Sequence, residues 1–474
     1  MTIGQFILMR HELLLIAAAL ILLVGELVLS EKGKFRMIHM AIALFALVTL
    51  VGFLPAQSGE LFGGSYQSNP LTVLMKNVLN LAVLIIFLQS EGWLKRPENR
   101  ERISEYFILT LVTLVGMNFM ISSGDFLMFY LGLETATIPA AALVAFDRLK
   151  SKSAEAGIKL IMSSALSSGI LLFGLSLIYG ATGSIYFADV LPKITPDPII
   201  VLAFIFFVAG MAFKISLVPF HFWTADVYEG APINVTSYLS VVSKGAAVFT
   251  FSIIVFKVFA PLFEQWQSLV YTLAVATMTL ANLFALRQDN IKRFLAFSSI
   301  AQAGFILLGI LGAGELGMSS VVYFVLVYVF TNLGAFGVAT AISNASGVET
   351  ISGYAGMYKT NPKLSLLMML SLFSLAGIPP VAGFFGKFFL FTAAASRGYY
   401  ILVLIAVLNA TISLYYYLRV VKSMFIDHSE QPVAFFRSSA AMRLSLILCV
   451  LGIFTIGFSS SIFEYIREIS RLFF

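Results

Sequence analysis

Residues 213–244 read FKISLVPFHFWTADVYEGAPINVTSYLSVVSK, an apolar stretch with a lysine near each end. Pro219 lies five residues after Lys214 and lacks the N–H that a helix interior requires, so the stretch predicts a helix that is broken there. Broken helices occur at membrane depth only where they contact protein or water, and in transporters they mark ion sites. The stretch therefore predicts a membrane protein with a discontinuous helix beside a buried lysine.

The composition of the whole chain predicts the same class. Only 11% of the 474 residues are Asp, Glu, Lys or Arg, against about 25% in soluble proteins, and 59% are apolar. This excludes a soluble enzyme, a disordered protein and, with Cys449 as the one cysteine, a disulfide scaffold. Runs of about 20 apolar residues can cross a bilayer as helices. We expect an all-α polytopic membrane protein of about 14 transmembrane helices, at 12–29, 37–54, 71–89, 106–122, 125–146, 157–179, 198–220, 231–257, 266–286, 294–313, 319–342, 364–396, 399–421 and 442–460.

Basic residues in the loops predict the orientation of the chain. Nineteen Lys and Arg fall in one set of alternating loops and six in the other. Cytoplasmic loops are the ones rich in Lys and Arg, so both termini are expected on the non-cytoplasmic side. The first run is expected to remain as a helix, because the loop after it, with Lys32 and Lys34, carries no small-residue cleavage site. The loops are too short for a soluble catalytic domain.

Five basic residues remain when those of the loops and the helix ends are set aside, and all are lysines: Lys76, Lys159, Lys214, Lys244 and Lys387. A buried lysine can lose and regain its proton, whereas an arginine stays charged. A charge at the centre of a membrane helix costs about 3 kcal/mol, so such residues are functional candidates by default. Thr236, Ser240 and Lys244 follow one another at i, i+4 and i+8, which predicts one polar face. The close spacing of Lys214, Ser216, Pro219 and His221 indicates a proton path, because the imidazole of histidine titrates near pH 6.5.

Several of these candidates also have a structural interpretation. Glu134 lies in the middle of a predicted helix, where its alternative is a neutral carboxylic acid hydrogen-bonded at a helix interface. Lys159 follows Glu155 by four residues, the spacing of a surface ion pair. Against that, a run of serines after Lys159 favours close helix packing and a polar face. A snorkelling or structural role for Lys76 stands beside a functional one, and Glu26 is expected to be structural.

A second interrupted helix follows later in the chain. Residues 375–389 read LAGIPPVAGFFGKFF, within a run of 33 residues that is too long for one straight span. The two broken helices are the seventh and the twelfth, and an odd offset of five predicts two inverted halves, a pattern typical of transporters. We expect a single membrane domain over 1–474, made of an N-terminal three-helix segment (1–105), inverted repeats of helices 4–8 (106–257) and 9–13 (266–421), and a last helix with a short tail (442–474).

The sequence resembles the antiporter-like membrane subunits of the proton-pumping NADH:quinone oxidoreductase, respiratory complex I. The resemblance covers nearly the whole chain. It rests on residues 213–244, LGLETATIP around Glu134, SAEAGIKLIMSSALSSGILLFGLSLIYG around Lys159, DNIKRFLAFSSIAQAGF at 289–305 and LAGIPPVAGFFGKFFLF around Lys387. The longer L-type of this family has a lateral helix after its last spans, and the M-type has a glutamate in place of Lys387. The chain is therefore similar to the N-type. Gln302 departs from the pattern, because many relatives have a histidine there.

The resemblance implies a subunit of an oxidoreductase that translocates protons while the redox chemistry occurs elsewhere. The implied relay is Glu134, Lys159, Lys214, His221, Lys244 and Lys387, driven by quinone reduction in other subunits. It also implies that FMN, iron–sulfur clusters and quinone belong to partner subunits and that this chain binds no cofactor. One cysteine cannot hold a cluster that needs four ligands. The implied partners are the M-type and the small K/J/A-type membrane subunits, the soluble redox arm indirectly, and lipid, with no nucleic acid. The implied location is a bacterial plasma (inner) membrane.

Two alternatives remain at this stage. Subunits of multi-subunit cation/proton antiporters and of membrane-bound hydrogenases share this fold, so the chain fits such complexes as well. The other alternative is a purely structural membrane spacer. The buried lysines argue against a spacer, which has no need of costly charges inside the membrane.

Overall fold

The computed structural model describes residues 6–28, 34–55 and 57–473, and its regular structure is almost entirely helical. Thirteen helices in this part of the chain are long and apolar enough to cross a membrane. Two shorter apolar helices, α17 (Pro362–Ala376) and α18 (Ala382–Ser396), together account for the predicted run 364–396. The all-α polytopic class and the count of about 14 are thus confirmed. The predicted loop that holds Lys32 lies outside the described residues.

The chain divides into two compact units. The first unit comprises Met1–Leu84, Trp93–Ile215 and Val242–Ser268, and the second comprises Ile85–Gly92, Ser216–Val241 and Leu269–Phe474. Both contain segments that are distant in sequence. The boundaries fall inside α4, α13 and the segment Leu239–Ser243, and between α9 and α10, so the first broken helix belongs partly to each unit.

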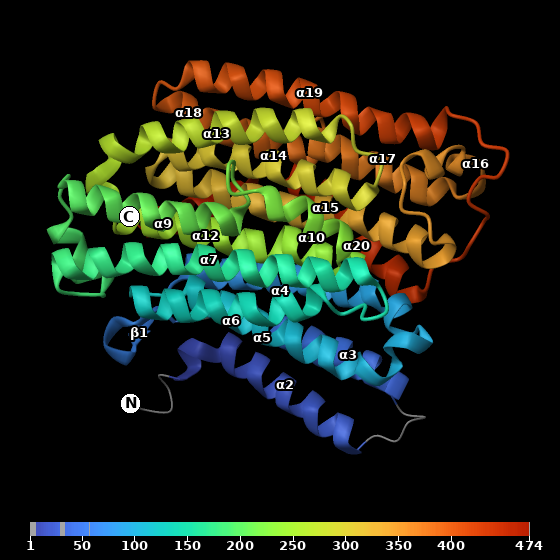
Figure 1. Cartoon of the computed structure of the whole chain (residues 1–474), viewed down its shortest axis with the longest axis horizontal. Coiled ribbons are helices and arrows are strands. Elements are labelled where there is room, and N and C mark those ends of the chain that lie inside the picture. Colours follow the sequence, from blue (N-terminus) through green and yellow to red (C-terminus); the bar gives the residue numbers. More distant parts are fainter. Residues whose placement is uncertain (1–5, 29–33, 56, 474) are drawn as a thin grey trace. The chain divides into compact units, whose positions relative to one another are not determined.

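The first unit holds most of the N-terminal segment and most helices of the predicted first repeat (Figure 1). Its elements are η1 (Ile7–Met9), α2 (Arg10–Val28), α3 (Lys34–Gly52), β1 (Gly59–Leu61), η3 (Phe62–Gly64), β2 (Tyr66–Ser68), most of α4 (Pro70–Leu94), η4 (Pro97–Arg102), α5 (Ile103–Ile121), α6 (Phe126–Val144), α7 (Ser151–Thr182), α8 (Phe187–Val190), η5 (Leu191–Lys193), α9 (Pro198–Ile215), α12 (Lys244–Lys257) and η7 (Ala260–Leu262).

Glycines allow two helix pairs of the first unit to approach closely. A Cβ atom on Gly116 of α5 would lie 2.7 Å from the carbonyl oxygen of Gly132 on α6, and the reverse substitution would be equally tight. In the second pair, a Cβ on Gly174 of α7 would lie 2.8 Å from the carbonyl oxygen of Ala203 on α9. Small residues at such crossings are typical of membrane helices, where packing supplies the attraction. The helices that carry Glu134, on α6, and Lys214, on α9, are therefore each packed backbone to backbone with a neighbour.

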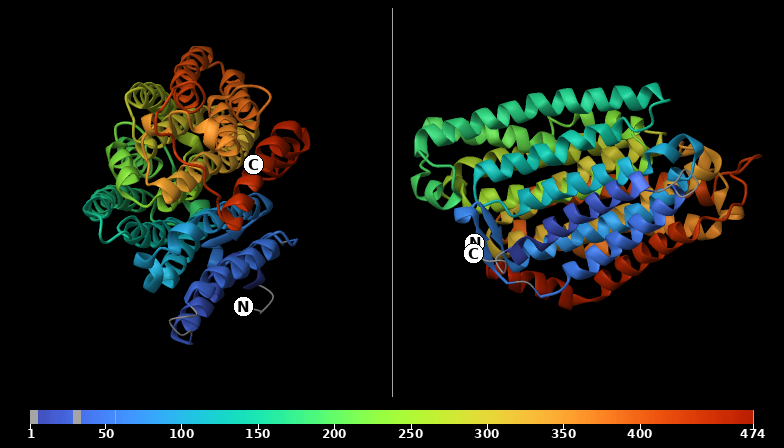
Figure 2. Two further views of the ribbon diagram at one scale, coloured as in Figure 1. Left: turned by 90° about the vertical axis from the view of Figure 1, so that its right-hand side faces the viewer. Right: turned by 90° about the horizontal axis from the view of Figure 1, so that it is seen from below.

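The second unit holds the later helices, which run in nearly common directions (Figure 1, Figure 2). Its elements are α10 (Phe222–Gly230), α11 (Ile233–Tyr238), part of the π-helical segment η6 (Leu239–Ser243), most of α13 (Phe263–Ala285), α14 (Ile291–Gly312), α15 (Gly314–Ser346), η8 (Ser352–Tyr354), α16 (Met357–Thr360), α17, α18, α19 (Tyr400–Phe425), α20 (Ala440–Phe458) and α21 (Ser460–Arg471).

Helices α14 and α15 form the core of the second unit. Every residue of α14 except Arg293 is buried, and α15 is buried from Gly317 to Ile342 except for one position. A helix that is hydrophobic all round belongs in a protein interior. Each nevertheless carries polar side chains, so those groups need partners inside the protein.

The predicted short tail contains a further helix, α21. Its sequence, SSIFEYIREISR, places Phe463, Ile466 and Ile469 on one buried face and charged residues on the other. The ring of Phe463 stacks on Phe389 of α18 with centroids 3.6 Å apart. Arg467 pairs with Glu315 at the start of α15 at 2.7 Å. This amphipathic helix therefore packs against α15 and against the ring of Phe389 on α18.

Candidate functional site

The first helix break lies where the sequence predicts it. Helix α9 ends at Ile215, Ser216 adopts a left-handed conformation with φ of +70°, and regular helix resumes only at Phe222 in α10. The Val218–Pro219 peptide bond is cis. The amide of Val218 donates a hydrogen bond to Thr277 Oγ1 at 3.0 Å. A side chain thus takes over a backbone group released by the break, as membrane burial requires.

Lys214 lies one residue before the end of α9 and contacts the helix that carries Glu134. Its Nζ atom donates a hydrogen bond to Thr137 Oγ1 on α6 at 2.7 Å, and Thr137 lies one turn beyond Glu134. Glu134 and Lys214 interact electrostatically, without a direct ion pair in the described part of the chain. The buried Glu134 Oε1 accepts no hydrogen bond from the described residues. The structure therefore brings this predicted pair together, with the Thr137 hydroxyl as an unpredicted third member.

Lys159 does not fit the prediction of a buried residue. Its Nζ atom lies 2.8 Å from Glu155 Oε1, and the side chain is 42% exposed on the outer face of α7. The hydroxyls of Ser163, Ser164 and Ser168 bond to carbonyls of their own helix. The prediction of burial is wrong for Lys159, because the apolar run around it cannot tell a face that meets neighbouring helices from one that looks outward.

Lys244 is buried at the start of α12, directly after a π-helical segment, Leu239–Ser243. In π-helix the hydrogen bonds run from residue i to i+5, and such segments are frequent at functional sites. The spacing of four from Ser240 to Lys244 is therefore not one regular α-helical turn. All three residues, Thr236, Ser240 and Lys244, are buried, and their common polar face stays a prediction.

The second break also lies where the sequence predicts it. Helix α17 ends at Ala376, Gly377 has a φ of +88°, the Pro379–Pro380 bond is cis, and α18 begins at Ala382. The buried Lys387 Nζ donates to the Ala376 carbonyl oxygen at 2.9 Å. It also lies 4.6 Å from the centre of the Phe305 ring. A cation at the carboxyl end of a helix is favourable, because the last carbonyls there lack partners within the helix.

Lys387 faces a small cavity inside the second unit. The cavity has room for about one water molecule and is lined by Gln302, Phe324, Val327, Tyr328, Thr331, Ser374, Leu375, Gly383 and Lys387. Gln302 Nε2 donates to the Leu375 carbonyl at 3.1 Å and to Tyr417 OH at 3.2 Å. Its Oε1 atom is buried without a partner among the described residues. The cavity can therefore accept a water molecule between the lysine and Gln302.

Hydroxyl and amide groups extend from this cavity along the second unit. Tyr328 OH lies 3.0 Å from Ser240 Oγ, and Asn332 Nδ2 donates to both. On the other side Tyr417 OH lies 2.6 Å from Ser298 Oγ. Sequence reasoning missed Tyr328, Asn332 and Tyr417. Their signal was a polar side chain in a helix that is otherwise apolar all round.

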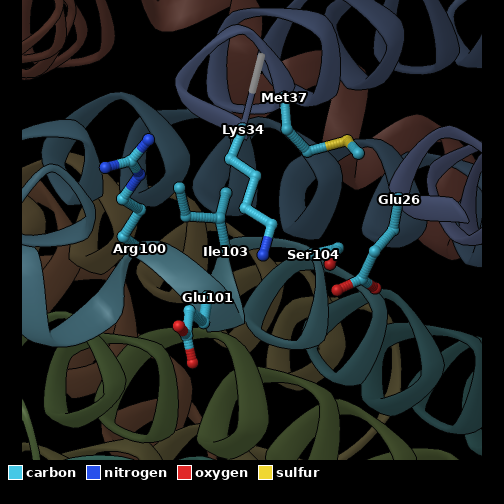
Figure 3. A pocket seen from close by; sticks show the side chains of 7 residues that line it. All are labelled: Glu26, Lys34, Met37, Arg100, Glu101, Ile103 and Ser104. Atoms are coloured by element: carbon cyan, nitrogen blue, oxygen red, sulfur yellow. The ribbon is translucent and has the colours of Figure 1, made fainter. Parts of the chain in front are cut away.

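The remaining predicted residues lie in separate places. His221, in the second unit, is buried at the start of α10, with its ring 4.5 Å from that of Phe222. Lys76 is paired with Glu12 in the N-terminal helices. Glu26 lines a small charged pocket of the first unit, and Figure 3 shows Glu26 and Lys34 extending toward Ser104. The site residues thus divide between the units, with Glu134, Lys159, Lys214 and Lys244 in the first and His221 and Lys387 in the second.

The family profile described as "NADH:quinone oxidoreductase/Mrp antiporter, TM" matches residues 123–413, which include both broken helices. The chain belongs to this family. Two relatives named NADH-quinone oxidoreductase subunit N are each 49% identical to it. The relative from Phocaeicola vulgatus is covered over 100% of both chains, and the relative from Azobacteroides pseudotrichonymphae over 99% of both. The predicted family and its N-type branch are confirmed by these similarities.

Solved structures with the same fold come from three kinds of membrane complex. A chain of respiratory complex I from Thermus thermophilus is 26% identical, with a TM-score of 0.78 over 94% of this chain and 96% of that one. A chain of an archaeal membrane-bound sulfane sulfur reductase is 23% identical, with a TM-score of 0.86 over 98% and 97%. A chain of the Mrp complex from Dietzia is 21% identical, with a TM-score of 0.84 over 99% and 97%. The last two likenesses concern the fold alone.

Proposed function

We propose that this chain is the N-type proton-translocating membrane subunit of an NADH:quinone oxidoreductase. The observation that carries the proposal is the 49% identity over the full length to relatives named subunit N of that enzyme. Two helix breaks with a lysine beside each support the translocating role. The driving reaction, with its FMN, iron–sulfur clusters and quinone, belongs to partner subunits in this proposal.

The proposed relay begins at the pair of Glu134 and Lys214. An opposite charge nearby favours the ammonium form of a lysine, so withdrawing the carboxylate charge favours release of the proton. Thr137, bonded to Lys214 Nζ, supplies a hydroxyl that can accept or donate during that change. Lys159 and His221 connect this pair toward Lys244, and Lys387 passes the proton on through the second half of the chain. Lys159, with its exposed partner Glu155, is the member at the outer face of α7.

We further propose that the chain lies in a bacterial plasma membrane with both termini on the non-cytoplasmic side. Its partners are the neighbouring M-type and small K/J/A-type membrane subunits. The inverted repeats over 106–257 and 266–421 belong to the same proposal. Their support is that each contains a helix interrupted by a left-handed residue and a proline.

Variants of the first pair test the relay. Lys214→Ala and Glu134→Ala are each expected to lower proton pumping by about tenfold or more per electron pair, in line with the loss of an acid–base group. Pumping is measured in membrane vesicles with a pH-sensitive dye, with assembly checked on native gels. Lys150→Ala, which removes an exposed pair with Asp147 on a loop, is the matched control. Pumping at the parental level in both variants, within an assembled complex, would show that the pair is not part of the relay.

A second candidate function is that of a cation/proton antiporter subunit, because the description of the matching family profile also names the Mrp antiporter. Isolation of the intact complex separates the two. Co-purification with a soluble arm that contains flavin and iron–sulfur clusters supports the oxidoreductase. Co-purification with small membrane subunits alone would favour the antiporter.

A further inference from the structure

A buried ion pair lies in the N-terminal helices, outside the segment that matches the family profile. Lys76 Nζ on α4 lies 2.6 Å from Glu12 Oε1 on α2, and each side chain is at most 1% exposed. The hydroxyl of Tyr66, on strand β2, accepts a hydrogen bond from Lys76 Nζ at 2.8 Å and donates one to Glu12 Oε2 at 3.0 Å. We call Glu12, Lys76 and Tyr66 the N-terminal triad. No step of the proposed relay uses it.

The chemistry of the triad favours one fixed arrangement. Burial raises the pKa of Tyr66 to about 12, so its hydroxyl keeps its proton and remains a donor throughout the physiological range. Removing one partner of a buried ion pair leaves an uncompensated charge, whereas replacing both partners with apolar residues is often tolerated. Because a buried ion pair is weak evidence for stability, we consider the geometry that this one specifies.

The triad holds a β-hairpin that is bonded to the start of α6. Tyr66 forms a backbone bridge with Ser123, Gln67 N donates to Ser122 O at 2.7 Å, and Gly124 N donates to Ser65 O at 2.8 Å. A Cβ atom on Gly124 would overlap the carbonyl oxygen of Gly64, so the two segments touch backbone to backbone. The next residue, Asp125, caps α6 by accepting a hydrogen bond from Met128 N at 2.6 Å.

Side chains reinforce the same contact. Tyr66 packs in a buried cluster with Met9 and Leu61, and Phe119 of α5 and Met128 of α6 lie against it. Glu134 follows Asp125 by nine residues on one helix, about 13 Å at 1.5 Å per residue. A helix transmits a shift of its first turn along its axis. The hairpin therefore determines where Glu134 lies relative to Lys214, the lysine that donates a hydrogen bond to Thr137.

We propose that the N-terminal triad is a positioning cluster, which anchors the hairpin and the N-terminus of α6 and thereby sets the place of Glu134 beside Lys214. The inference rests on the proposed role of Glu134. It gives the N-terminal helices a part in proton transfer without placing them on the proton path.

The test uses the assembled complex and two variants. The double variant Glu12→Met/Lys76→Met removes both charges and keeps similar volume, and Tyr66→Phe removes only the hydroxyl. Tyr179→Phe, at an exposed tyrosine on α7, is the matched control. Hydrogen exchange measured by mass spectrometry should be about tenfold faster in segments 59–68 and 122–128 of the double variant, because both lose an anchor. The pH profile of proton pumping should shift in both triad variants and not in the control.

The outcomes separate this inference from the proposed function. Unchanged exchange in both segments of an assembled double variant would overturn the anchoring. Faster exchange with a parental pH profile would overturn the positioning of Glu134. Should the double variant fail to assemble, Tyr66→Phe, which keeps the ion pair, decides both points. Parental pumping in Glu134→Gln would instead overturn the proposed role of Glu134, whatever the exchange rates are.

Discussion

Lys214 and Lys387 are held by different kinds of acceptor, although each lies beside a helix break. Lys214 donates a hydrogen bond to the hydroxyl of Thr137, and a hydroxyl group can act as a donor as well as an acceptor. Lys387 donates to the backbone carbonyl of Ala376, which can only accept. The Thr137 hydroxyl donates its own proton to the Leu133 carbonyl, so it would have to leave that carbonyl to donate to a neutral Lys214. The partner of Lys387 is part of the helix break itself.

Thr137→Val tests the role of the hydroxyl that accepts the hydrogen bond from Lys214. Valine keeps the branched shape but removes the acceptor of Lys214, and a hydrogen bond to a charged group contributes about 1.5–3 kcal/mol. We expect pumping to fall by roughly tenfold, which corresponds to about 1.4 kcal/mol, with normal assembly. Thr182→Val, at a hydroxyl at the end of α7 that bonds to the backbone groups of Ile178 and Ser184, is the control. Parental pumping in Thr137→Val would make that hydroxyl dispensable.

Lys159→Ala distinguishes a relay residue from a surface pair. Exposed ion pairs contribute about 0–1 kcal/mol, so complex stability should stay within about 0.5 kcal/mol of the parent. Replacement of Lys159, the outer member of the proposed relay, should lower pumping by less than Lys214→Ala does, because its side chain lies outside the buried part of the path. Glu155→Ala, which removes only the partner, provides the comparison. If Lys159→Ala pumps like the parent, Lys159 is not part of the relay and serves only in the surface ion pair with Glu155.

At the scale of single elements, the second break depends on a glycine. Gly377 has a φ of +88°, and a Cβ atom there would lie 3.0 Å from Lys387 Cδ. Any other residue would carry the cost of the left-handed conformation, about 1–2 kcal/mol, and its Cβ atom would displace the side chain of Lys387. The glycine at the break therefore leaves the space that the Lys387 side chain occupies when it bonds to the Ala376 carbonyl oxygen.

Gly377→Ala is expected to lower both the thermal stability of the complex and its pumping. Gly398→Ala is a close control, since Gly398 has a φ of +84° with no atom near its Cβ position. Both variants carry the conformational cost, but only the first disturbs Lys387. Thermal unfolding on native gels and dye-based pumping measure the two effects. Equal pumping in the two variants would indicate that the glycine serves the backbone alone.

Sequence reasoning predicted the elements well where one residue decides them. Pro219 and the Gly377–Pro380 stretch locate the breaks, and Lys214 and Lys387 lie beside them as expected. The π-helical segment before Lys244 was missed because it has no local residue signature. The Glu12–Lys76 pair was missed because the two residues are 64 positions apart, and only the packed helices bring them together. The outward face of Lys159 was missed because lipid-facing and protein-facing helix surfaces are equally apolar in composition.

At the scale of the whole molecule, the proposed orientation predicts which ends of helices meet which solution. Leu472→Cys, at an exposed position after α21, should react with a membrane-impermeant maleimide in intact cells. Ser151→Cys, at the exposed start of α7, should react only after the membrane is permeabilised. The natural Cys449 is fully buried and should remain unlabelled in both. The opposite labelling pattern would reverse the proposed topology.

The enclosure of α14 and α15 has a consequence for how the protein is made. Ribosomes deliver these helices to the membrane before α17, α18 and α20, which later pack against them. Until then Gln302 and Thr331 lack the carbonyl of Leu375 and the hydroxyl of Ser374 as partners. Biogenesis of the second unit therefore passes through a stage in which these apolar helices carry polar side chains without their final partners, in lipid or in the insertion machinery. Translation that stops after α15 should leave a chain marked for degradation.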